Sequence, residues 1–151
     1  MLDAIGNFLG NSALHSFMVD VGPAFPICET LHFIGLSLLF GSLLLVDLRA
    51  MGFLKGLPLV ALHRLVPLAF AGFVNNAITG VLFIAFDPPT YFTNSAFLWK
   101  MVLIAVAGVN ALVFEFAVFR PLVAGNAAVE QGALIKLLSA LSLLLWCGVL
   151  I

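Results

Sequence analysis

Charged residues are scarce in this chain, and their scarcity excludes an ordinary soluble domain. Six lysine or arginine residues and seven aspartate or glutamate residues make up 9% of the 151 residues, whereas soluble globular domains carry about 25%. Hydrophobic residues account for 64% of the chain, and the mean hydropathy is +1.24. This composition indicates a polytopic membrane protein whose main partner is the lipid bilayer.

Other absences narrow the function. The chain has no run of basic residues and a formal net charge of -1, which argues against nucleic acid as a partner. Its two cysteines cannot form a disulfide framework. Residues 1–20 contain no lysine or arginine, so they lack the positive region of a secretory signal. The sequence has no P-loop, dinucleotide fingerprint or Ser-His-Asp arrangement with credible spacing, and it gives no indication of an enzyme.

Four apolar stretches are each long enough to cross a bilayer, which takes roughly 20 residues of helix. Glycine and proline residues separate these stretches. The expected spans are residues 26–48, 65–86, 97–119 and 133–151. We therefore expect a single all-α membrane domain over residues 1–151, built as an integral membrane four-helix bundle.

A short amphipathic helix is expected before the first span, over residues 1–20. Leu2, Ile5 and Leu9 recur at helical spacing, and Asp3 falls on the opposite face. This pattern is typical of a helix that lies in the membrane interface.

The cations of the loops predict the orientation of the spans. Five of the six lysine and arginine residues flank the first and third connections, and such residues collect on the cytoplasmic side of a membrane. We therefore expect a multi-pass protein of the bacterial inner membrane with both termini in the periplasm.

The first span carries a carboxylate and an imidazole one helical turn apart, Glu29 and His32. This spacing puts them on one face, which we expect to look into the bundle. Lys100 of the third span has a similar estimated depth, so an ion pair with Glu29 is expected. Asn76 and Asn110 lie deeper and complete the predicted polar cluster. The alternative to a functional site is that Glu29 and Lys100 form an ion pair that only stabilises the bundle.

Two further groups of polar residues have ordinary explanations. At the inner end of the first span, Asp47 and Arg49 are expected to compensate one another in the interface. In the fourth span, Ser139 and Ser142 are expected to hydrogen-bond between spans.

Haem b is one cofactor that the sequence allows. His32 can serve as an axial ligand, because helical bundles hold haem through inward histidines. His63 cannot share an iron with it, since the two positions differ in depth by about 25 Å at about 1.5 Å per residue. The second ligand is expected to be His15, if the interfacial helix folds over the outer mouth, or His32 of a second copy.

Copper is the other cofactor to consider. Cys28, Glu29 and His32 lie close together in the first span, and sulfur is a preferred ligand of Cu(I). Apolar packing is the alternative role for Cys28, because free cysteine is an ordinary buried residue and no C-x-x-C motif is present.

Four segments carry a family resemblance: LHFIGLSLLFGSLLLVDLR in the first span, RLVP and ITGVLF in the second, and FLWK at the start of the third. The chain resembles an uncharacterised bacterial family of small four-span integral membrane proteins and, more distantly, the membrane domain of copper-resistance D-type proteins. It is shorter than the copper proteins and lacks their metal-collecting methionines. The resemblance singles out His32, Gly35, Gly41, Asp47, Arg49, Arg64, Pro67, Thr79, Gly80 and Lys100.

These observations favour a haem- or metal-binding bundle that takes part in electron or metal transfer, with its site toward the periplasm. The expected partners are further copies of the chain or a membrane redox protein. A non-redox transport or assembly protein that uses Glu29, His32 and Lys100 is the main alternative. A purely structural membrane subunit is the third.

Overall fold

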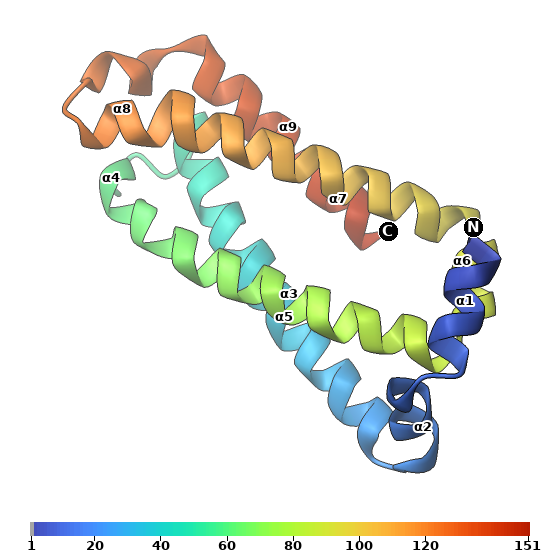
Figure 1. The fold of residues 1–151 in the computed structure, drawn as a ribbon. Coiled ribbons are helices and arrows are strands. Elements are labelled where there is room, and N and C mark those ends of the chain that lie inside the picture. The colour runs from blue at the N-terminus through green and yellow to red at the C-terminus, as the bar shows by residue number, and fades with distance from the viewer. Residues whose placement is uncertain (1) are drawn as a thin grey trace. The chain divides into compact units, whose positions relative to one another are not determined.

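The computed structural model describes residues 2–151 of the chain, with side chains described from residue 6 onward. Within this range the chain forms helices and no strand (Figure 1). Four helical segments are long and apolar enough to span a membrane: Ala24–Met51, Leu59–Phe86, Ser95–Val123 and Ala133–Leu150. The expected all-α fold class with four membrane helices is confirmed, and the chain is a multi-pass membrane protein.

The first span is helix α3, Ala24–Met51, which begins two residues before and ends three residues after the expected limits. Its end follows from Gly52, whose φ of 97° is a left-handed conformation that costs glycine little. The amide of Gly52 donates to the Arg49 carbonyl, and the amide of Phe53 donates to the Leu48 carbonyl, both at 3.0 Å. This is the Schellman arrangement that closes a helix.

The second span is interrupted near its start. It consists of helix α4, Leu59–Leu62, a 3-10 turn η1, His63–Leu65, and helix α5, Val66–Phe86. Asp87 ends the span and caps the next short helix, α6, Pro88–Thr93, because its side chain accepts from the Thr90 amide.

The third span is helical throughout but changes its winding. It comprises α7, Ser95–Phe114, a π-helical turn η2, Glu115–Phe119, and α8, Arg120–Val123. A 3-10 turn η3, Ala127–Gln131, then leads to the fourth span, α9, Ala133–Leu150.

The amphipathic segment forms two helices where a single helix was expected over residues 1–20. Helix α1, Leu2–Gly10, and helix α2, Ala13–Asp20, are separated at Asn11 and Ser12. The Ser12 hydroxyl donates to the Leu9 carbonyl at 2.6 Å and accepts from the amide of His15, so one side chain closes α1 and caps α2. Helix α1 lies beside α6 (Figure 1). The predicted apolar stripe rests partly on Leu2 and Ile5, whose side chains lie outside the described ones.

The chain divides into two compact units. The first contains the chain up to Leu39 together with Phe70–Trp99, and the second contains Phe40–Ala69 and Lys100–Ile151. The core of the first unit gathers Met18, Ala24, Cys28, Phe25, Leu82, Phe83 and Phe86. The core of the second gathers Val46, Ala50, Leu59, Phe114, Val118, Phe119, Leu122, Ile135 and Leu138.

Candidate functional site

The buried face of α3 in the first unit carries Cys28 rather than Glu29. Ala24, Cys28 and Gly35 are buried and His32 is half-buried, whereas Glu29 is exposed. One residue turns a helix by about 100°, so neighbours in sequence face different surroundings. Within the first unit, Glu29 therefore lies off the buried face of α3.

His32 is held by a short chain of hydrogen bonds to α5. Its Nδ1 lies 2.7 Å from the Thr79 Oγ1, which in turn donates to the Asn75 carbonyl at 2.8 Å. A hydroxyl has a single proton to donate, so Thr79 accepts from His32. This contact fixes the orientation of the His32 ring beside α5.

His15 is anchored in a similar way, because its Nδ1 lies 2.8 Å from the Ala85 carbonyl, which can only accept. Aromatic side chains form a series of contacts between the two imidazoles. Ring centroids are 5.3 Å apart for His32 and Phe83, 5.5 Å for Phe83 and Phe25, and 4.8 Å for Phe25 and Phe86. Phe86 and His15 line the same pocket. Because these rings occupy the region, the described packing does not fit a haem clamped between His15 and His32.

The predicted metal ligands do not come together. The Cys28 thiol donates to the Thr79 carbonyl at 3.6 Å, while Glu29 is exposed. Among the side chains of residues 6–151, no group of three histidine, cysteine, aspartate or glutamate residues is placed to hold a metal ion. The expected site of Cys28, Glu29 and His32 is thus not supported.

The predicted polar cluster is divided between the two units. Glu29 and Asn76 belong to the first unit, and Lys100 and Asn110 belong to the second. The pairing of Glu29 with Lys100 stays a prediction.

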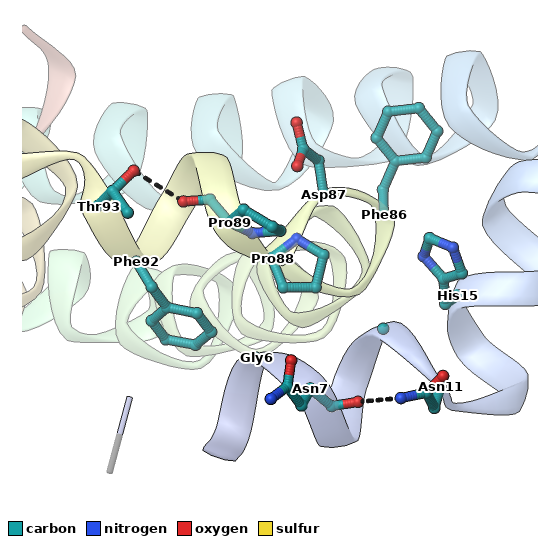
Figure 2. A pocket seen from close by; sticks show the side chains of 11 residues that line it. Gly6, Asn7, Asn11, His15, Phe86, Asp87, Pro88, Pro89, Phe92 and Thr93 are labelled. Carbon is teal, nitrogen blue, oxygen red and sulfur yellow. Dashed lines mark hydrogen bonds between the residues drawn. The ribbon is translucent and has the colours of Figure 1, made fainter. Parts of the chain in front are cut away.

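A pocket of about 450 Å³ lies in the first unit between the N-terminal helices and the end of α5 (Figure 2). Polar side chains that line this pocket form hydrogen bonds with residues close to them in the sequence. Asn11 donates to the Asn7 carbonyl at 2.8 Å, and Asp87 accepts from the Thr90 hydroxyl at 2.6 Å. These groups serve as helix caps and turns, so they do not point to a ligand.

The second unit holds a group of buried polar side chains from three helices, which we call the Asp47 cluster. Its members are Asp47 of α3, Asn110 of α7, and Ser139 and Ser142 of α9. The exposed fractions of these residues are 3%, 6%, 0% and 7%, respectively. This is the most deeply buried carboxylate site in the described part of the chain.

Two contacts on α9 assemble the Asp47 cluster. The Asp47 carboxyl lies beside the hydroxyls of Ser142 and Ser139, which share one face of α9 because they are three residues apart. The amide of Asn110 donates to the Leu138 carbonyl at 3.1 Å, directly before Ser139. The three helices therefore bring one carboxylate, one amide and two hydroxyls to the same stretch of α9.

Several atoms of the Asp47 cluster are buried without a hydrogen bond. Asp47 Oδ2, Asn110 Oδ1 and Ser139 Oγ make no hydrogen bond of good geometry within the described structure, although the Ser139 hydroxyl lies beside the Asp47 carboxyl. An unsatisfied buried polar atom typically costs about 1–3 kcal/mol, so these atoms call for an explanation.

The nearest cation in the sequence does not compensate Asp47. The guanidinium of Arg49 donates to the Leu57 carbonyl and pairs with Glu130 of η3. Elsewhere among the described side chains, Glu115 pairs with Arg120 and contacts the imidazole of His63. The expected compensation of Asp47 by Arg49 is therefore wrong.

Sequence reasoning assigned Asp47 to the rim and its two serines to ordinary packing. The sequence did contain one signal for this site. The spacing of Ser139 and Ser142 places both hydroxyls on one face of the fourth span. Nothing in the sequence showed that Arg49 would turn toward Glu130 in place of Asp47.

Comparison with known proteins places the chain in a family without giving it an activity. No curated protein and no solved structure matches it. The distant likeness to copper-resistance D-type proteins therefore has no support from these comparisons. One family model matches residues 13–151, which is most of the chain. In agreement with the resemblance to an uncharacterised family, the chain belongs to DUF6644, a family of unknown function.

Proposed function

We propose that the protein is a non-redox membrane transport protein that binds a small cationic solute at the Asp47 cluster. The observation that carries this proposal is a carboxylate, 3% exposed, in a membrane-spanning helix, with one oxygen that lacks a hydrogen-bond partner in the described structure. Ionisable residues inside membrane proteins are costly and commonly mark the path of an ion or a proton.

A purely structural role explains the Asp47 cluster less well. Polar groups that only join helices gain stability by bonding to one another, typically by about 1 kcal/mol. In the Asp47 cluster, Asp47 Oδ2 and Asn110 Oδ1 make no hydrogen bond of good geometry among the described residues, so these two acceptors add little to the joining of the helices. A site that exchanges a solute needs coordinating atoms that the protein itself does not occupy.

Transport by purified protein in liposomes tests the proposal. Vesicles loaded with dyes for protons and for alkali cations should show flux above that of empty vesicles. Asp47→Asn should reduce this flux at least tenfold, because it removes the negative charge and keeps the shape. Glu29→Gln is the matched control, since Glu29 is an exposed carboxylate of the same helix, and it should leave the flux nearly unchanged. Equal flux in wild-type protein and Asp47→Asn would contradict the proposal.

A haem-binding electron-transfer protein is the second candidate. It is favoured by the hydrogen bond between His32 Nδ1 and Thr79, because a histidine that ligates a metal usually donates its other ring N–H to such an acceptor. A second copy would have to supply the other ligand. If this function is correct, the purified protein shows a Soret band that is lost in His32→Ala and retained in His63→Ala. A colourless protein expressed with excess haem would exclude it.

A further inference from the structure

We infer that the solute of the Asp47 cluster is a dehydrated monovalent metal cation of the sodium class. This inference rests on the proposed transport function and names its substrate. Its basis is the donor set, the charge and the unpartnered atoms of the Asp47 cluster.

The donor atoms that the Asp47 cluster offers are all oxygen. They are the Asp47 carboxylate, the Asn110 amide oxygen and the hydroxyls of Ser139 and Ser142. Carboxylate, carbonyl and hydroxyl oxygens suit hard cations, whereas copper and other soft ions favour sulfur and imidazole. A transition metal is therefore a poor match for this site.

The charge of the site fits a single positive charge. Asp47 is the one carboxylate in the Asp47 cluster, and the other three members are neutral. Arg49 is engaged at Glu130, and Lys136, three residues before Ser139, is exposed. A divalent ion in an all-protein site usually takes several carboxylates, so a monovalent ion balances this site better.

The buried oxygens of the Asp47 cluster also fit a metal ion. Asp47 Oδ2 and Asn110 Oδ1 are acceptors without a hydrogen bond of good geometry in the described structure, and the Ser139 hydroxyl lies beside the Asp47 carboxyl. A metal cation can draw several such oxygens at once.

One contact suggests that the site is organised before the cation arrives. The Asn110 amide nitrogen is tied to the Leu138 carbonyl at 3.1 Å, which fixes the direction of its oxygen. Because the donor side of the amide is used, the acceptor side is the one left for a ligand.

Thermal unfolding of the purified full chain in detergent tests the inference. Sodium chloride should raise Tm saturably, by about 5 °C at saturation, over choline chloride of the same ionic strength. Asp47→Asn should abolish the saturable rise. Ser139→Ala should weaken the apparent affinity for sodium at least tenfold. Ser37→Ala is the matched control, because its exposed hydroxyl bonds only to the Phe33 carbonyl of its own helix, and it should respond like the wild type.

A direct measurement keeps the inference testable if Asp47→Asn fails to fold. Binding of radioactive sodium to wild-type protein should be displaced by unlabelled sodium and, less well, by potassium. Absence of saturable sodium binding, with no stabilisation by sodium, overturns the inference. If proton flux that depends on Asp47 persists in that case, the transport function stands without sodium. Sodium binding without flux of any cation would instead overturn the transport function.

Discussion

Thr79 shows how a single buried hydroxyl can hold a neighbouring side chain in one orientation. It is 2% exposed and bonds to His32 on one side and to the Asn75 carbonyl on the other. The threonine supplies an acceptor at a depth where water is scarce, so the contact holds the imidazole ring in one orientation beside α5.

The substitution Thr79→Val should destabilise the protein by about 1–2 kcal/mol, because it keeps the shape but leaves the His32 Nδ1 proton without its acceptor. Nitrogen chemical shifts of the His32 ring should change, because Nδ1 loses its hydrogen-bond partner. Thr30→Val is the control, since the exposed Thr30 hydroxyl bonds only to the Pro26 carbonyl in its own helix. Equal losses of unfolding free energy in the two variants would show that the contact between Thr79 and His32 adds no stability.

The four spans were predictable as elements because each is a long apolar run and because glycine and proline residues, such as Gly52, mark the connections between them. The finer breaks were not. The division between α1 and α2 depends on the Ser12 side chain, which bonds to the backbone on both sides. The π-helical turn Glu115–Phe119 interrupts an apolar sequence that reads as ordinary helix. Such features depend on local bonding that hydrophobic periodicity does not report.

At the contact of α3 with α5 in the first unit, two glycines let the backbones approach closely. A Cβ at Gly72 would lie 2.7 Å from the Leu39 amide nitrogen and would also meet the Gly35 carbonyl. Because backbone atoms cannot yield as a side-chain end can, Gly72→Ala should destabilise the protein by about 2 kcal/mol or more. Gly80→Ala in the same helix has nothing within 4 Å of its Cβ, so it should be neutral or slightly stabilising. Denaturation of both variants in detergent compares them, and equal stabilities would refute the close contact.

At the scale of the whole molecule, the orientation of the spans decides which side of the membrane the Asp47 cluster lies near. Asp47 stands one turn before the end of α3, and the rim beyond it carries most of the cations of the chain. If these cations mark the cytoplasmic side, as the positive-inside rule predicts, the Asp47 cluster lies nearer to the cytoplasm than to the periplasm. Its distance from that rim is about 6 Å at 1.5 Å per residue.

We therefore predict that both termini lie outside the cytoplasm, with Arg49, Lys55 and Arg64 inside. The reason is that five of the six lysine and arginine residues would otherwise have to be moved across the membrane. A phosphatase fused to the C-terminus should be active in bacterial cells, and a fluorescent protein fused there should be dark. Fusions at Gly56, in the first connection, should give the reverse pattern and serve as the control. Fluorescence of the C-terminal fusion would show that the topology is the opposite of the predicted one. The Asp47 cluster would then lie near the outer face, where external sodium reaches it first.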